Sequence, residues 1–154
     1  MKVSIFENPA VTEDHAEIHC QSATDEILWA AGLLENTGKR LIGIKDGAET
    51  PLSISGIFYF KAVEKRTFAC LQTEVYEVFL TLKEAEERFR SLGFVRISKS
   101  VVVNLYRVQA IKNDFEMRTL ICLDNQENLI ISRHYRSAFR ERLAAAVSGK
   151  EARS

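Results

Sequence analysis

The chain has 154 residues, of which 46% are hydrophobic and 27% are charged, and its 21 basic residues balance its 21 acidic residues. This composition is typical of an ordered globular protein, and no apolar run reaches the roughly 18–20 residues that a membrane-spanning helix needs. The N-terminus lacks the hydrophobic stretch of a signal peptide, and the three scattered cysteines suggest neither a disulfide framework nor a zinc site, so we expect a reduced, cytoplasmic protein.

The charge is unevenly distributed along the chain. Residues 1–55 carry 4 Lys/Arg and 9 Asp/Glu, residues 56–93 carry 6 of each, and residues 94–142 carry 9 Lys/Arg and 5 Asp/Glu. A basic C-terminal third behind an acidic beginning is the pattern of a nucleic-acid-binding module attached to an acidic partner segment.

Residues 1–50 are predicted to form a small α+β extension. The hydrophobic pattern predicts short strands at Lys2–Phe6, Ala16–Cys20 and Leu41–Lys45. Between them, DEILWAAGLLE at Asp25–Glu35 predicts an amphipathic helix with Ile27, Leu28, Ala31 and Leu34 on one face. We expect this acidic extension to serve self-association or contact with a partner, with Trp29 either packing the helix on the neighbouring strands or joining that contact.

The same extension contains two histidines whose spacing invites a metal-site interpretation. In H-A-E-I-H, from His15 to His19, the Glu stands one place later than in the zincin motif, and in a strand these two positions lie about 13 Å apart. We therefore interpret both as ordinary surface histidines. No Ser/His/Asp set or glycine-rich phosphate loop is visible, so we expect no metal, cofactor, small-molecule substrate or enzymatic activity.

Residues 52–93 are predicted to form a β meander followed by a helix. Four β runs occur between Leu52 and Phe79, with polar turns at Glu64–Arg66 and Thr73–Glu74. Thr81 and Glu84 have the spacing of a capping box, and Gly93 suits the left-handed end of a helix, so the sequence predicts a helix at Leu82–Leu92.

The remaining chain is predicted to hold more strands and a final helix. Strands are expected at Val101–Val103, Val108–Lys112, Arg118–Leu123 and Leu129–Ile131, with a hairpin turn at Asp124–Asn128. Ser132 can cap a helix whose buried stripe is Tyr135, Phe139 and Leu143, and residues 148–154 are expected to be a disordered tail. The predicted core residues are Phe58, Phe60, Phe68, Phe79, Phe89, Val102, Ile121 and Phe139.

Two segments carry unusual polar density. The first is FVRISKSVVVNL at Phe94–Leu105. Its otherwise apolar strand is interrupted or flanked by five polar residues: Arg96, Ser98, Lys99, Ser100 and Asn104. The second, IISRHYR at Ile130–Arg136, starts a helix with Arg133, His134 and Arg136 in its first turns, where free N–H groups and the helix dipole attract phosphate. Taken separately, the charges fit a solvated face equally well, and Asn104 fits a structural turn hydrogen bond.

Taken together, these segments resemble a known family. Tyr59–Phe60, the helix near Thr81–Leu92, FVRISKSVVVNL and ISRHY follow the order and spacing of the LytTR DNA-binding domain, over roughly Leu52–Leu143. The resemblance rests on an F-x-R-x-H-x-S-x-x-V-N pattern followed about thirty residues later by S-R. Ser98 stands where the family usually has His, while Lys99 keeps the position from which family members commonly read a base edge.

The resemblance implies an α+β, predominantly β fold: a LytTR-like elongated β-sandwich with short helices over residues 51–147, after the extension 1–50. It would present loops rather than a recognition helix to successive major grooves on one face of bent double-stranded DNA. Base contacts are expected from Lys99 and Arg133, and more weakly from the loop Lys65–Arg66–Thr67. Phosphate contact or loop support is expected from Arg96, Ser98, Ser100, Asn104, Arg118, His134 and Arg136.

The expected function is therefore a bacterial, response-regulator-like transcription regulator that binds promoter sites as a homodimer. The chain has no room for a phosphoacceptor receiver domain of about 120 residues, so control is expected from a membrane protein encoded nearby or from a partner subunit. The alternative is a protein-interaction module that docks an acidic partner on its basic face and has no direct role on DNA.

Overall fold

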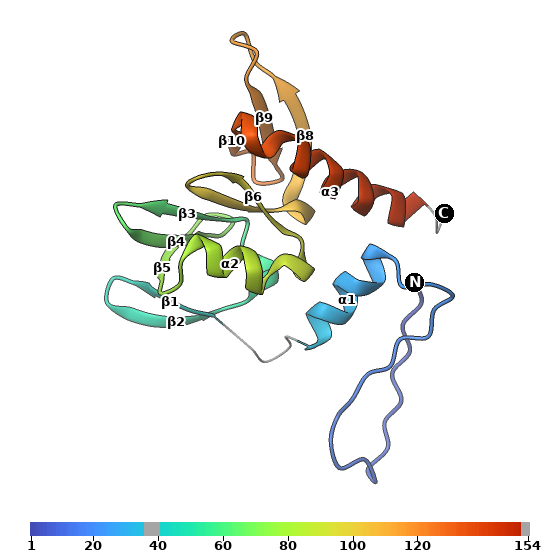
Figure 1. The fold of residues 1–154 in the computed structure, drawn as a ribbon. Coiled ribbons are helices and arrows are strands. Elements are labelled where there is room, and N and C mark those ends of the chain that lie inside the picture. Colours follow the sequence, from blue (N-terminus) through green and yellow to red (C-terminus); the bar gives the residue numbers. More distant parts are fainter. Residues whose placement is uncertain (36–40, 152–154) are drawn as a thin grey trace.

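The computed structural model describes residues 1–35 and 41–151 (Figure 1). Its larger sheet contains β1 (Leu41–Lys45), β2 (Ala48–Leu52), β3 (Tyr59–Val63), β4 (Arg66–Cys70), β5 (Val75–Val78), β6 (Phe94–Ser98) and β7 (Val101–Asn104). The spatial order is β2-β1-β5-β4-β3-β7-β6, and every neighbouring pair is antiparallel. A smaller antiparallel sheet has the order β10-β9-β8, with β8 at Val108–Asn113, β9 at Thr119–Leu123 and β10 at Asn128–Ile130.

Three α-helices and three short 3-10 turns complete the described fold. The α-helices are α1 (Asp25–Glu35), α2 (Leu82–Arg88) and α3 (Arg133–Glu151), and the turns are η1 (Ile54–Gly56), η2 (Arg90–Leu92) and η3 (Leu105–Arg107). None of the described helices combines the length and the hydropathy of a transmembrane span. The predicted α+β, predominantly β fold is confirmed.

The larger sheet has a hydrophobic core on each face, because its side chains alternate. On one face Phe60 packs with Phe89, beside α2, and with Phe94, at ring-centroid distances of 5.8 and 5.5 Å. On the other face, buried residues of β6 and β7 meet Ile121 of β9 and Phe139 of α3. The molecule is therefore layered, with α2 on one side and the smaller sheet and α3 on the other.

The turn after α2 follows from its glycine. The Thr81 hydroxyl accepts a hydrogen bond from the Glu84 N–H at 3.1 Å, as the predicted cap requires, and Gly93 has a φ of +92°. A Cβ at Gly93 would lie 2.5 Å from the Tyr106 ring. Because the α-helix ends at Arg88, where η2 takes over, the predicted helix is correct in position but is regular over only its first part.

The extension is joined to the rest of the molecule. β1 lies between β2 and β5 in the larger sheet, so the predicted boundary at residue 50 falls inside β2. The α1 helix packs through Trp29, whose ring centroid lies 4.6 Å from that of Tyr106. The contact includes η2, because a Cβ at Gly32 would lie 2.9 Å from Leu92.

The predicted face of α1 is partly wrong. Ile27 is buried, but Leu28 and Leu34 are about half exposed, and Gly32 and Leu33 face the body instead. The reason is that Gly32 has no side chain, which lets this side of the helix approach Leu92 most closely.

Two predicted strands and two predicted core residues differ in the structure. Lys2–Phe6 and Ala16–Cys20 form no strand, because nothing in the described chain pairs with them; we refer to residues 1–24 as the N-terminal arm. Phe79 is exposed, since it alternates with the buried residues on either side, and Phe68 is only half-buried. Finally, α3 continues to Glu151, into the predicted tail 148–154, whose last three residues lie outside the described chain.

Candidate nucleic-acid interface

Backbone hydrogen bonds connect three segments that are distant in the sequence. The Ala62 N–H in β3 donates to the carbonyl of Ser100 in the β6–β7 turn at 2.9 Å, and the Ser132 N–H before α3 donates to the carbonyl of Ile97 at 2.9 Å. These two bonds therefore join β3 to the β6–β7 turn, and β6 to the residue that precedes α3. We use the term loop surface for Glu64–Lys65, Ser98–Ser100 and Arg133–His134.

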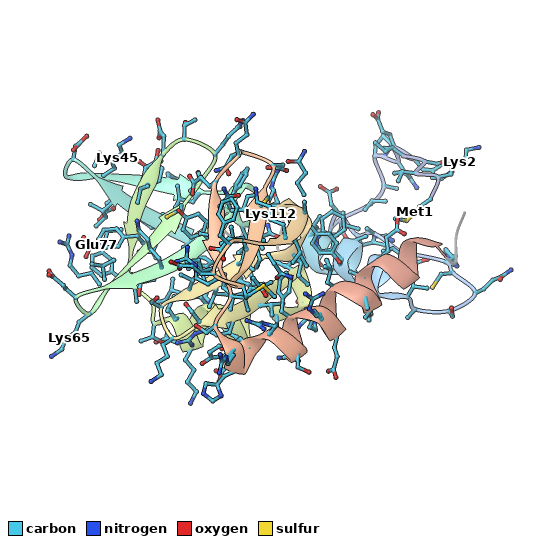
Figure 2. The ribbon with its side chains drawn as sticks, turned by 90° about the horizontal axis from the view of Figure 1, so that it is seen from above. Met1, Lys2, Lys45, Lys65, Glu77 and Lys112 are labelled. Carbon is cyan, nitrogen blue, oxygen red and sulfur yellow. The ribbon has the colours of Figure 1, made fainter. Side chains whose placement is uncertain are left out.

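The β3–β4 turn presents Lys65. Glu64 and Lys65 have φ values of +50° and +67°, so this is a two-residue hairpin turn of the type that matches strand twist. Lys65 is exposed and lies at one end of the molecule (Figure 2).

The other two residues predicted for this loop are engaged within the sheet. The Arg66 Nε donates to Glu77 Oε1 at 2.9 Å, and its Nη2 donates to Glu77 Oε2 at 2.5 Å. This pairing lowers the pKa of Glu77. Thr67 is 8% exposed and paired with Ala62 and Val78. Both Lys65 and Arg66 are exposed, but Arg66 is already paired with Glu77, so Lys65 is the better candidate for a DNA contact.

The β6–β7 turn is held from beneath by Arg96. Its Nε donates to the carbonyl of Ser98 at 2.7 Å, and its Nη2 donates to the carbonyl of Lys99 at 2.5 Å. The Arg96 side chain is 19% exposed, and its Nη1 lies 3.5 Å from Glu86 Oε2 of α2. The Ser98 hydroxyl accepts a hydrogen bond from the Ser100 N–H at 3.2 Å, which leaves Lys99 exposed at the tip of a shaped turn.

Sequence reasoning missed the role of Glu86. Glu86 shares the helix side of Ala85 and Phe89, both of which are buried. An acidic residue on the packed side of a helix indicates a basic partner, and here that partner is Arg96.

Two residues from the predicted set have other surroundings. Asn104 is 4% exposed, its Nδ2 donates to the carbonyl of Ile57 at 3.0 Å, and its Oδ1 accepts a hydrogen bond from the Tyr106 N–H at 3.1 Å. Arg118 lies in the β8–β9 connection, directly before β9, where Asp114 and Glu116 pair with it at 2.6 and 3.2 Å. Its guanidinium lowers the pKa of Asp114.

The start of α3 presents Arg133 and His134, which are both exposed. The helix is oriented by Phe139, which is fully buried among residues of both sheets, and by the partly buried Tyr135. Arg136 is half-buried, and its Nε lies buried without a hydrogen-bond partner among the described residues. Two features favour an anion here: a helix N-terminus and an exposed arginine.

Comparison with known proteins identifies the family of the chain. Residues 48–144 match the family model described as the LytTr DNA-binding domain. The chain belongs to the LytTR family. The LytTr DNA-binding domain from Bacillus cereus, a solved structure, superposes with a TM-score of 0.63 and 26% identity, covering 68% of this chain and 95% of that one.

Relatives of similar length match nearly the whole LytTR protein. An uncharacterized HTH-type transcriptional regulator of Staphylococcus aureus strain MSSA476 is 25% identical over 146 residues, which are 94% of this chain and 99% of the relative. The corresponding protein of the bovine strain RF122 / ET3-1 is 26% identical over the same length. Although these relatives carry an HTH-type name, strands separate the described α-helices of this LytTR protein, and the loop surface is built from two turns and the start of α3.

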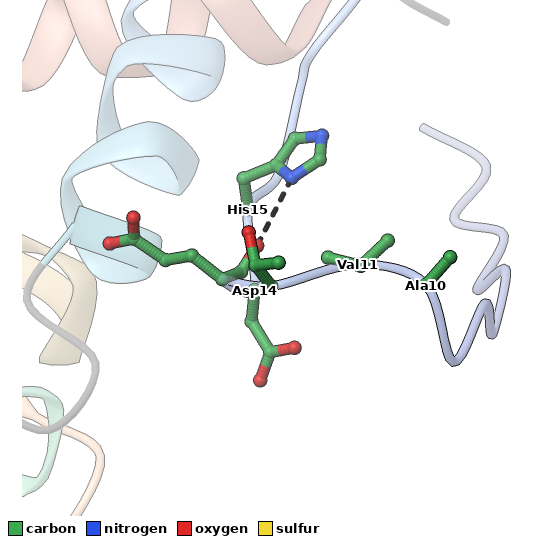
Figure 3. A pocket seen from close by; sticks show the side chains of 6 residues that line it. Ala10, Val11, Asp14 and His15 are labelled. Atoms are coloured by element: carbon green, nitrogen blue, oxygen red, sulfur yellow. Dashed lines mark hydrogen bonds between the residues drawn. The ribbon is translucent and has the colours of Figure 1, made fainter.

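The hollow in the N-terminal arm is a different kind of feature. It is lined by Ala10–His15, six consecutive residues, and the His15 Nδ1 lies 3.4 Å from the carbonyl oxygen of Glu13 (Figure 3). A binding or catalytic site usually gathers polar groups from several elements. A hollow made by one exposed segment does not have that construction.

Proposed function

We propose that this LytTR protein is a bacterial transcription regulator that binds specific promoter sites on double-stranded DNA through the loop surface, as a homodimer. The observation that carries the proposal is the pair of backbone hydrogen bonds that joins β3 to the turn of Lys99 and β6 to the residue before Arg133, with Lys65, Lys99 and Arg133 all exposed. Its chemistry is that of a ligand with phosphates and base edges, which exposed cations on shaped turns can reach.

We assign different DNA contacts to Lys65, Lys99 and Arg133 and to their neighbours. We assign base-edge contacts to Lys99 and Arg133, which extend from turns fixed by backbone hydrogen bonds, and a weaker contact to Lys65. Phosphate contacts are assigned to His134 and Arg136 beside the N-terminus of α3. Ser98 and Ser100 shape the turn that carries Lys99.

Four residues from the sequence prediction are left out of the proposed contacts. Arg66 and Arg118 already neutralise carboxylates, so a phosphate would have to displace an existing partner. Thr67 and Asn104 are buried in the fold. Arg96 is assigned to loop support, because its guanidinium holds two carbonyls of the Lys99 turn.

The remaining parts of the proposal concern the cellular setting. We place the regulator in the cytoplasm, where its DNA is, and assign it no enzymatic activity. Its activity would be set by a partner protein, including a membrane protein, that contacts the acidic extension. The acidic balance of residues 1–55 supports a protein partner rather than DNA for that part of the chain.

The test is selection of bound sequences from a random duplex library, followed by titration of the selected and scrambled duplexes at several salt concentrations. A DNA reader will enrich a defined site, and log affinity will fall steeply against log salt because several phosphates are neutralised. Failure to enrich any sequence, together with a flat salt dependence, would favour a module that docks acidic proteins on this basic face.

A further inference from the structure

The N-terminal arm leaves apolar side chains in solvent. Val3, Ile5 and Phe6 are 77%, 86% and 90% exposed. In the part of the chain that the structure describes, the backbone groups of residues 2–6 donate and accept no hydrogen bonds. A segment with β-branched side chains and open backbone groups can pair with another strand.

The chain itself contains one obvious partner segment, but it is unused. Ala16–Cys20 lies in the same arm, is mostly exposed and also forms no strand. In a strand, Ala16, Ile18 and Cys20 would share one face and Glu17 and His19 the other, so the segment would offer Val3 and Ile5 only one large aliphatic side chain.

We propose that Lys2–Phe6 is a dimerisation strand, which pairs antiparallel with the same segment of a second copy of this chain about a two-fold axis at Ser4. This inference rests on the homodimer in the proposed function and names the surface that forms it. A two-fold axis perpendicular to an antiparallel pair places each residue opposite a residue that points to the same face.

The segment complements itself in this register. Val3 of one copy faces Ile5 of the other, and the symmetry repeats the contact, so four β-branched side chains form one continuous apolar cluster. Lys2 faces Phe6, and Glu7 faces Met1. Neither charged residue of the segment therefore meets a like charge, and apolar residues meet the charged ones through their side-chain stems.

The position of the segment suits a dimer on DNA. Met1 and Lys2 lie at the end of the molecule opposite Lys65 (Figure 2). Both views place the start of the chain beside the end of α3, whereas Arg133 is at the beginning of that helix. Pairing through Lys2–Phe6 thus leaves both loop surfaces free to bind paired half-sites.

The first test uses disulfide trapping in the full chain. Because Ser4 faces Ser4 across the axis, Ser4→Cys will form a covalent dimer readily under mild oxidation: opposed residues in a strand pair have Cα atoms within about 4.5–5.5 Å, the range of disulfides. The exposed native cysteine is removed by Cys20→Ser. Asn8→Cys on the same arm is the matched control, since the same pairing would separate its two copies by about 27 Å.

The second test exchanges charges across the proposed register. Phe6→Lys would oppose Lys2 of the other copy twice in each dimer, so the dimer dissociation constant measured by analytical ultracentrifugation will rise at least about tenfold. Adding Lys2→Glu to Phe6→Lys puts opposite charges across from each other, and the constant will return toward that of the natural chain. Phe115→Lys changes an equally exposed phenylalanine elsewhere and will leave the constant unchanged.

Binding of each variant to a single half-site is measured in parallel. Rapid trapping at Ser4, loss of the dimer with Phe6→Lys and recovery in the double variant, with half-site binding intact, establish the strand. If the dimer dissociation constant is unchanged in both charge variants, or if Ser4→Cys and Asn8→Cys are trapped equally, the dimerisation strand is refuted but the homodimer is not. A chain that stays monomeric, both free and on DNA, overturns the strand and the homodimer, but not DNA binding by the loop surface.

Discussion

Replacement of Arg96 separates a loop support from a DNA contact. The guanidinium makes one part-buried hydrogen bond, to the carbonyl of Ser98, and a more exposed one, to the carbonyl of Lys99. Hydrogen bonds to a charged group contribute about 1.5–3 kcal/mol each. Water can replace the exposed bond, while Glu86 loses its cationic neighbour, so Arg96→Met will lower the free energy of unfolding by about 2–3 kcal/mol.

The expected change is measurable by thermal unfolding and by DNA titration. For a protein of this length, a loss of about 2–3 kcal/mol lowers Tm by about 4–12 °C. Affinity for the selected site will fall more than affinity for random duplex, because the turn that positions Lys99 loses its shape. The slope of log affinity against log salt will stay unchanged, since no phosphate contact is removed.

The conservative variant supplies the control. Arg96→Lys keeps the positive charge but cannot hold two carbonyls in the geometry of a planar guanidinium. It will therefore behave like Arg96→Met if Arg96 supports the turn. Natural stability in Arg96→Met, together with a salt slope that falls by about one unit and recovers in Arg96→Lys, would refute the reasoning and make Arg96 a phosphate contact.

Four further predictions follow from the fold and the loop surface. Arg133→Ala will cost about 1–3 kcal/mol on the selected duplex and much less on a scrambled one; equal losses on both would leave it a backbone anchor. Arg136→Ala will weaken both duplexes similarly and reduce the salt slope by about one unit, which the same titrations check. Phe139→Ala will lower the free energy of unfolding by about 3–5 kcal/mol in urea melts, because the Phe139 ring, on α3, is fully buried among residues of both sheets. Gly93→Ala will cost about 2–3 kcal/mol in the same melts, since it combines a positive φ with a clash against Tyr106; a neutral result would show that the Tyr106 ring can move aside.

Local sequence patterns predicted most of the fold, because the hydrophobic residues of each strand or helix recur with the period of that element. Leu41–Lys45 and Asp25–Glu35 have the bounds that the pattern indicated, and Gly93 ends η2 with a positive φ, as expected of a left-handed residue. The errors concern features that depend on contacts with residues far along the chain. The face of α1 depends on Leu92, far along the chain, which Gly32 allows to approach.

The candidate site was predictable in its residue types but not in their roles. A basic residue in or near a turn looks the same in sequence whether it is exposed at the tip, like Lys99, or donates hydrogen bonds to the carbonyls of the turn, like Arg96. Arg66 was placed in a loop, although the hairpin turn ends one residue earlier and the strand register sets it beside Glu77. Such roles depend on strand pairing, which propensity does not specify.

The backbone hydrogen bonds that join β3 to the β6–β7 turn, and β6 to the residue before α3, bear on how such regulators diverge in evolution. Lys65 and Lys99 stand at turn tips, and Arg133 stands on the first turn of a helix, so exchanging any of these side chains leaves the pairing of the sheet untouched. A change at one tip need not move the other two. With the base contacts proposed for these three residues, duplicated genes for this scaffold could acquire new promoter preferences one contact at a time while each intermediate sequence still folds.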